Sequence, residues 1–152
     1  MELKKGDKAP AFSTKDQNGN IVTLDQFKGQ KVVLYFYPKD DTPGCTAEAC
    51  DLRDNYSGLK AKKIEVLGVS VDDERSHQKF ITKYALPFTL LADTEKQIVE
   101  AYGVWGEKNM YGKKYMGTTR KTFLIDENGN IEHIIDKVDT KNSTAQILEL
   151  IG

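Results

Sequence analysis

The chain has 152 residues, of which 39% are hydrophobic and 30% charged, and its 22 basic residues nearly balance its 23 acidic ones. This length is typical of one folded domain, here residues 1–152, and the balanced charge argues against nucleic acid as a main partner. No stretch is long and apolar enough to span a bilayer, which excludes a membrane-spanning protein.

The start of the chain and the number of cysteines indicate its compartment. The first residues, MELKKGDKAPAF, carry a basic pair without a following apolar run, so they lack the hydrophobic region of a secretory signal. We therefore expect a cytoplasmic protein. In a reducing compartment two cysteines are more often free or catalytic than a permanent crosslink, and with only two cysteines and two histidines we expect no closed zinc site.

The hydrophobic pattern predicts an alternation of strands and helices. The strand-like segments are apolar runs rich in β-branched and aromatic residues, whereas the helical segments carry apolar residues three or four positions apart. In chain order the predicted elements are a hairpin of strands 12–16 and 21–24, strand 32–37, helix 46–62, strand 64–71, helix 74–85, strand 88–93, helix 95–102, strands 121–126 and 131–138, and helix 142–151. The Gly- and Lys-rich segment 103–120 shows no clean period and is predicted to be irregular.

The order of these elements defines a fold class. Strand 32–37, its following helix and strand 64–71 predict a parallel pair joined by a right-handed crossover. The last two strands, separated only by ENGN, predict an antiparallel hairpin. Together they predict an α/β fold, a thioredoxin-like three-layer sandwich with a central mixed sheet and an added N-terminal β-hairpin.

The segment YPKDDTPGCTAEAC, residues 37–50, places a cysteine where a buried strand is followed by a helix. Thr42 is suited to cap that helix and Pro43 to open it, so Cys45 would lie in the first turn. Unpaired backbone N–H groups and the helix dipole favour an anion there, and such settings lower the pKa of a thiol from about 8.5 to between roughly 3.5 and 7.5. We therefore expect a reactive thiolate, with Gly44 leaving room beside it for a small electrophile, rather than an inert buried thiol.

Cys50 is the second sulfur of this segment. Five residues along an α-helix advance about 7.5 Å and rotate by about 140°. The Cα atoms of Cys45 and Cys50 would then lie over about 8 Å apart, beyond the roughly 7 Å limit for a disulfide. A bond between them requires the first turns of the helix to unwind. The alternative is that Cys50 is simply part of the core.

At these residues the chain resembles the peroxiredoxins, and among them the bacterioferritin comigratory protein branch, also called peroxiredoxin Q. The resemblance extends over almost the whole chain. Its most specific part is FYPKDDTPGCTAEAC, with Pro38, Thr42 and Cys45, followed in the family's order by LPFTLLAD, YGVWGEKNMYG and RKTFLID.

The resemblance implies a thioredoxin-dependent peroxidase of the atypical 2-Cys kind. Cys45 would be the peroxidatic cysteine, oxidised to sulfenic acid by hydrogen peroxide or an organic hydroperoxide, and Cys50 the resolving cysteine that condenses with it. Thioredoxin or a similar dithiol would then reduce the disulfide. The resemblance further implies a monomer that needs no metal, haem or flavin.

The family pattern also implies three supporting residues. Pro38 would shield the site from water, Thr42 would donate a hydrogen bond toward the sulfur or the peroxide, and Arg120 would supply a cation that favours the thiolate. Successive strand residues face opposite ways, so the sequence alone does not choose between Arg120 and Lys121, and the family pattern selects Arg120. Whether the hydroxyl of Thr42 caps the helix or serves the sulfur stays open.

Two other functions remain compatible with the sequence. A general thiol–disulfide oxidoreductase is disfavoured, because its second cysteine would stand where Glu48 is. A redox sensor would use the unwinding of the helix to change a partner surface. No role is assigned to Glu48, expected to be a solvated acid, to His77, expected on a helix surface, or to His133, expected in a strand.

Overall fold

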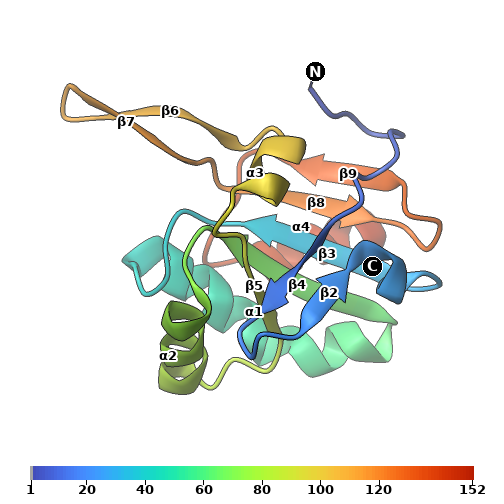
Figure 1. Ribbon diagram of the computed structural model, residues 1–152. Coiled ribbons are helices and arrows are strands. Elements are labelled where there is room, and N and C mark those ends of the chain that lie inside the picture. The colour runs from blue at the N-terminus through green and yellow to red at the C-terminus, as the bar shows by residue number, and fades with distance from the viewer. Residues whose placement is uncertain (1) are drawn as a thin grey trace.

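The computed structural model describes residues 2–152 and contains nine strands and four α-helices within that range (Figure 1). The strands are β1 Ser13–Asp16, β2 Ile21–Thr23, β3 Lys31–Phe36, β4 Ile64–Ser70, β5 Thr89–Ala92, β6 Trp105–Met110, β7 Lys113–Thr118, β8 Lys121–Ile125 and β9 Ile131–Ile135. The helices are α1 Pro43–Ala61, α2 Glu74–Tyr84, α3 Gln97–Ala101 and α4 Ser143–Ile151, with a 3₁₀ turn at Leu24–Phe27. None of these described helices has the length and apolar character needed to cross a bilayer.

Seven of the strands form one mixed sheet, in the order β2-β1-β5-β4-β3-β8-β9. β3 pairs in parallel with β4, and β4 in parallel with β5, as crossovers through α1 and α2 require. β8 joins the other side of β3 in antiparallel orientation and continues into β9. The predicted mixed sheet and its N-terminal hairpin are therefore confirmed.

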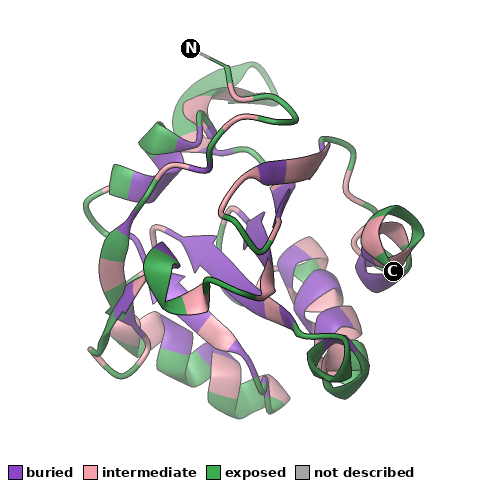
Figure 2. Ribbon diagram, turned by 90° about the vertical axis from the view of Figure 1, so that its right-hand side faces the viewer, coloured by how far each residue is buried: buried purple, intermediate pink, exposed green. Residues whose placement is uncertain are grey.

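The sheet lies between two layers of helices. Alternate residues of β3 enter different cores: Val32, Leu34 and Phe36 face the core that contains α3, whereas Val33 and Tyr35 face the core under α1, α2 and α4. Figure 1 shows α3 above the sheet and α1 below it, and Figure 2 shows buried strands in the middle with exposed outer helix faces. This is the predicted three-layer sandwich.

The segment 103–120, which the sequence predicts to be irregular, is largely an antiparallel hairpin. β6 and β7 pair only with each other and extend away from the body of the molecule (Figure 1). Their turn consists of Tyr111 and Gly112, whose φ angles of 54° and 80° are typical of a tight two-residue hairpin turn. Most side chains of this hairpin are exposed, so the alternation that marks a half-buried strand is absent. The prediction of an irregular segment was wrong for this reason.

Candidate active site

Cys45 lies in the first turn of α1, directly after the loop that follows β3. The residue is buried, with 1% of its surface exposed, and belongs to the core under α1. Thr42 is the N-cap residue, as predicted, but its side chain makes no capping hydrogen bond. The N–H groups of the first turn are thus left unpaired by the cap, and the positive end of the helix dipole lies beside the sulfur.

The hydroxyl of Thr42 has a different partner. It donates to the carbonyl oxygen of Lys39 at 2.9 Å, so the N-cap residue does not use its side chain for capping, one of the two roles left open for this hydroxyl. A hydroxyl that donates its proton keeps lone pairs on its oxygen, which are free to accept from a bound molecule. Pro38, in the same loop, is half-buried and has no amide N–H.

Arg120, the residue before β8, reaches across to α1. Its Nη2 donates to Sγ of Cys45 at 3.2 Å, and its Nη1 donates to Oε1 of Glu48 at 2.9 Å. The neighbouring Lys121 points elsewhere and pairs with Asp136 at 3.0 Å. A guanidinium this close to a thiol favours the thiolate. Here one terminal nitrogen donates to the sulfur and the other to a carboxyl group.

Gly44 allows the guanidinium to come this close. A Cβ atom at Gly44 would stand 3.1 Å from Nη2 of Arg120, nearer than ordinary van der Waals contact. The space that a side chain would need beside the sulfur of Cys45 is therefore taken by the arginine. Gly44 directly precedes Cys45 in the chain, and its missing side chain is what lets Arg120 reach the sulfur.

Glu48 is completely buried, so the expectation of a solvated acid was wrong. It follows Cys45 by three residues and therefore shares its face of α1. Oε1 accepts from Arg120, whereas Oε2 has no hydrogen-bond partner among the described residues. Burial raises the pKa of Glu48 to about 7, against the opposing charge and hydrogen bond of Arg120. Near neutral pH the carboxyl group is consequently divided between its neutral and ionised forms.

Cys50 is half-buried on α1, and both cysteines are free thiols. The helix is continuous from Pro43 through both residues. Ideal helical geometry places Cα atoms five residues apart at over about 8 Å, which is too far for a disulfide. The structure therefore corresponds to the reduced protein, in which α1 is intact. The unwinding of α1 stays a prediction.

Two residues near the site were not recognised in the sequence. His77, expected on a helix surface, is completely buried, and its ring contacts Asp40 in the loop between β3 and α1. Lys108 of β6 donates to the carbonyl oxygen of Thr118 at 2.9 Å, and burial together with the positive charge of Arg120 lowers its pKa. Among residues 2–152, no group of three or more His, Cys, Asp or Glu side chains could hold a metal ion.

The surroundings of Cys45 are of the kind that makes a thiol reactive. A buried thiol in the first turn of a helix, hydrogen-bonded by a guanidinium on a thioredoxin-like sandwich, is typical of a thiol-dependent redox protein. A model of the AhpC/TSA family matches residues 5–134. The chain belongs to this family and, within it, to the peroxiredoxins of the Bcp or peroxiredoxin Q branch, which are thiol peroxidases.

Individual relatives agree with this assignment over nearly the full chain. Peroxiredoxin Bcp of Escherichia coli K12 is 51% identical over 140 residues, which are 92% of this chain and 90% of that protein. A cysteine mutant of PrxQ from Xylella fastidiosa superposes with a TM-score of 0.93 at 29% identity, covering 99% of this chain and 96% of the other. The bacterioferritin comigratory protein of Xanthomonas campestris, described for its alkyl peroxide reduction activity, superposes with a TM-score of 0.85 at 34% identity, covering 92% and 90%.

Proposed function

We propose that this peroxiredoxin reduces hydrogen peroxide and organic hydroperoxides with Cys45 as the peroxidatic cysteine, Cys50 as the resolving cysteine and thioredoxin or a similar dithiol as the reductant. The observation that carries the proposal is the 3.2 Å contact between Nη2 of Arg120 and Sγ of Cys45, at the N-terminus of α1. A cation and a helix terminus both favour the thiolate, which is the attacking form of the thiol.

In the first step the thiolate of Cys45 attacks one peroxide oxygen. An S–O bond forms, the O–O bond breaks, and the departing oxygen takes a proton to leave as water or an alcohol, while the cysteine becomes a sulfenic acid. Negative charge moves from the sulfur to the departing oxygen. Arg120, already hydrogen-bonded to the sulfur, is placed to follow that charge and stabilise it.

Thr42 and Pro38 complete the site. Because the hydroxyl of Thr42 donates to Lys39, its oxygen serves as an acceptor for the O–H of a hydroperoxide and so orients the substrate. Pro38, in the loop before α1, offers no N–H to water, which would keep the site drier and strengthen the electrostatic interactions of Arg120 there.

In the second step the thiol of Cys50 attacks the sulfenic sulfur of Cys45, an S–S bond forms and water leaves. The first turns of α1 must unwind for this, because the intact helix holds the two Cα atoms too far apart. A dithiol of the thioredoxin type then reduces the disulfide by exchange and becomes oxidised itself, after which α1 re-forms.

The proposal is tested with two cysteine variants. Cys45→Ser should abolish peroxide consumption in the presence of thioredoxin and its reductase. Cys50→Ser, the matched control, should still consume one equivalent of peroxide but should not turn over with thioredoxin. Mass spectrometry after one equivalent of peroxide should find a Cys45–Cys50 disulfide in the unchanged chain. Normal turnover by Cys45→Ser would refute the assignment.

The preferred peroxide and the oligomeric state are tested separately. The alkyl peroxide reduction attributed to the Xanthomonas protein supports an organic hydroperoxide as one substrate here. Rates measured with hydrogen peroxide and with cumene hydroperoxide will rank the two classes. We further propose that the active protein is a monomer, for which light scattering should give a mass near 17.1 kDa.

A further inference from the structure

His77 of α2 is completely buried although it plays no part in the proposed chemistry. Both ring nitrogens have close partners: Nδ1 lies 2.7 Å from Oδ2 of Asp40, and Nε2 lies 2.9 Å from the carbonyl oxygen of Leu91 in β5. The side chain of Asp40 is also almost fully buried, with 4% exposed. A buried pair of this kind costs solvation energy and therefore calls for a reason.

The partners of His77 define its charge. The carbonyl oxygen of Leu91 can only accept, so Nε2 carries a proton. Asp40 already accepts from the hydroxyl of Tyr37 at 2.6 Å and from that of Ser76 at 2.7 Å. With two donors already on this carboxyl group, Nδ1 is best satisfied as a third donor, and this arrangement favours an imidazolium paired with a carboxylate.

The charged groups around the ring are consistent with that state. Burial opposes the imidazolium, but the hydrogen bond and charge of Asp40, the carbonyl of Leu91 and the charge of Asp72 outweigh it and raise the pKa of His77. Asp72, which follows β4, also accepts from the backbone N–H of Asp40 at 2.8 Å. Tyr37 after β3 is a further titratable neighbour, with its ring centroid 6.5 Å from that of His77, and its own pKa is raised well above its usual value by burial and by Asp40.

Asp40 belongs to the short loop that carries the catalytic groups. Pro38 and Thr42 flank it, and α1 with Cys45 follows directly. The carboxylate holds this loop to α2 through His77, and the backbone N–H holds it to the end of β4. Because α1 begins only two residues after Asp41, any shift of the loop moves the N-terminus of α1 relative to Arg120, which comes from a different element.

We infer that the buried Asp40–His77 pair fixes the loop before α1 and thereby sets the distance from the peroxidatic thiol to Arg120, so that Asp40 and His77 are positioning residues for the reaction. The inference rests on the proposed role of Cys45. Neither residue touches the reacting atoms. Their effect passes through the backbone of residues 40–45 to the sulfur.

The structure offers variants that separate the two contacts of the ring. The amide nitrogen of His77→Asn replaces Nδ1 and keeps a donor toward Asp40, whereas that of His77→Gln replaces Nε2 and keeps only the donor toward Leu91. The matched control is Lys83→Met. Lys83 joins the same helix to the same loop through Asp41 at 2.8 Å, but this pair is exposed, with 58% and 42% of the side chains accessible, and contributes little.

Two measurements are made on each variant in a Cys50→Ser background, so that only the first oxidation is seen. Stopped-flow gives the rate of Cys45 oxidation by hydrogen peroxide, and the pH dependence of iodoacetamide alkylation gives the thiolate population of Cys45. We expect His77→Gln to lose about 10- to 100-fold in the rate at pH 7 and to need a higher pH for alkylation. His77→Asn should retain more of both, and Lys83→Met should stay within about twofold.

Equal losses for His77→Asn and His77→Gln would overturn the inference, and so would a folded His77→Gln whose rate and alkylation profile are unchanged. If His77→Gln does not fold by circular dichroism, Ser76→Ala, which removes one donor from Asp40, must show a loss above about twofold in the same direction. Alkylation does not depend on peroxide. A chain that fails to consume peroxide would therefore refute the proposed function while the alkylation profiles still test the Asp40–His77 pair.

Discussion

Replacing Glu48 by Gln tests how the charge of Arg120 is shared. In the structure one guanidinium donates both to Sγ of Cys45 and to Oε1 of Glu48. A carboxylate at this position competes with a thiolate for the same cation. Glu48→Gln keeps an oxygen that accepts from Arg120 and removes the competing charge, and since Oε2 has no partner among the described residues, the substitution breaks no hydrogen bond there.

The magnitude follows from the spacing of the two side chains. Cys45 and Glu48 are three residues apart on α1, so their Cβ atoms lie about 5 to 6 Å from each other. At an effective dielectric constant of about 20, two unit negative charges at that distance repel by about 3 kcal/mol, equivalent to about two pH units in a titration. Because the pKa of Glu48 is about 7, the carboxyl group is about half ionised at neutral pH. We therefore expect the pH midpoint of Cys45 alkylation to fall in Glu48→Gln, by no more than these two units.

The assay is iodoacetamide alkylation of Cys45 between pH 4 and 9 in a Cys50→Ser background. Asp54→Asn is the control, because Asp54 is an acid on the same helix that is 64% exposed and pairs with Arg53. Its midpoint should not move. A midpoint that stays in place or rises in Glu48→Gln would refute the competition between the carboxylate and the thiolate.

The same variant has a second readout in stability. The folded chain keeps the proton of Glu48 up to a pH of about 7, whereas a carboxyl group with the ordinary pKa of 4.5 releases it earlier. The unfolded chain thus binds fewer protons between these values, so the free energy of unfolding should fall by about 3 kcal/mol as the pH rises from 4.5 to 7. Glu48→Gln should remove this slope, which urea unfolding at several pH values would measure.

Three further predictions concern residues around the site. Gly44→Ala places a Cβ 3.1 Å from Arg120 and should slow peroxide oxidation of the thiol about tenfold or more in stopped-flow. Lys121→Met should change that rate by less than about twofold, because Lys121 pairs with Asp136 and not with the sulfur. The pKa of His77 is raised in the folded chain, so protonated His77 stabilises the fold fully below about pH 6.5, and this stabilisation is lost as the pH rises through the raised pKa. The difference in Tm between the unchanged chain and His77→Gln should therefore shrink as the pH rises over that range.

The sequence contained signals for two residues that were misjudged. Glu48 lies three residues after Cys45 and four before Leu52, so helical spacing already places it on the buried face of α1. His77 lies three residues before Phe80 and four before Ile81, so helical spacing likewise places it on the apolar face of α2. Both residues are polar and were therefore expected at the surface, although their helical positions indicate burial. A polar residue on an apolar helical face indicates a buried partner, and here the partners come from segments distant in sequence.

Other features could not be read from the pattern. The apolar runs predicted β3, β4 and β8 because burial on both faces leaves a strong signal. The β6–β7 hairpin leaves none, since it is exposed and its turn uses Tyr111 in a left-handed conformation instead of the usual Asn. The position of Arg120 beside Cys45 likewise depends on the pairing of β3 with β8, which brings together two residues 75 positions apart in the chain, and only the resemblance to a family could anticipate it.

The unwinding proposed for disulfide formation meets a specific resistance at Asp51, the residue after Cys50. Its Oδ2 accepts from the backbone N–H of Thr144 at 2.7 Å, in the first turn of α4, whose own N-cap residue Asn142 makes no capping bond. Asp51 of α1 thus caps α4, and a cap of this kind is worth about 1 kcal/mol. Unwinding that extends through Cys50 pulls Asp51 away and uncaps α4.

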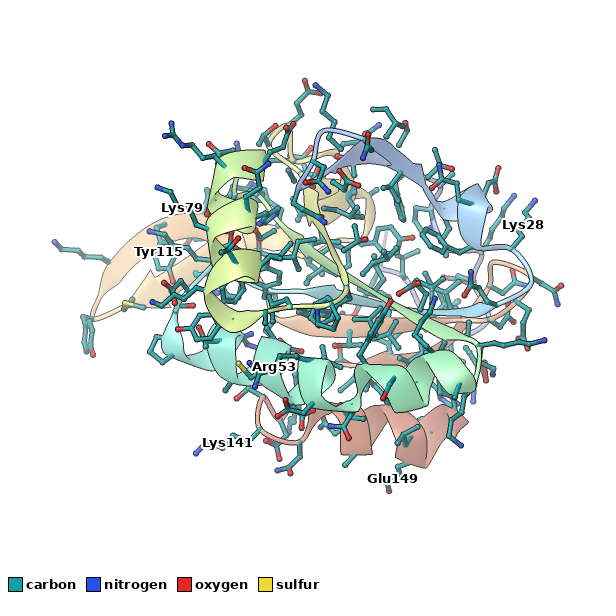
Figure 3. All side chains as sticks on the ribbon, turned by 90° about the horizontal axis from the view of Figure 1, so that it is seen from below. Lys28, Arg53, Lys79, Tyr115, Lys141 and Glu149 are labelled. Carbon is teal, nitrogen blue, oxygen red and sulfur yellow. The ribbon has the colours of Figure 1, made fainter. Side chains whose placement is uncertain are left out.

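Removing this cap should therefore make the helix easier to open. After a pulse of peroxide, Asp51→Ala should form the Cys45–Cys50 disulfide about fivefold faster than the unchanged chain, which is the factor that about 1 kcal/mol represents. Glu149→Gln, on the exposed side of α4 (Figure 3), is the control and should leave the rate unchanged. If Asp51→Ala closes the disulfide no faster, the opening stops short of Asp51, and Cys50 must reach Cys45 by movement of the first turn alone.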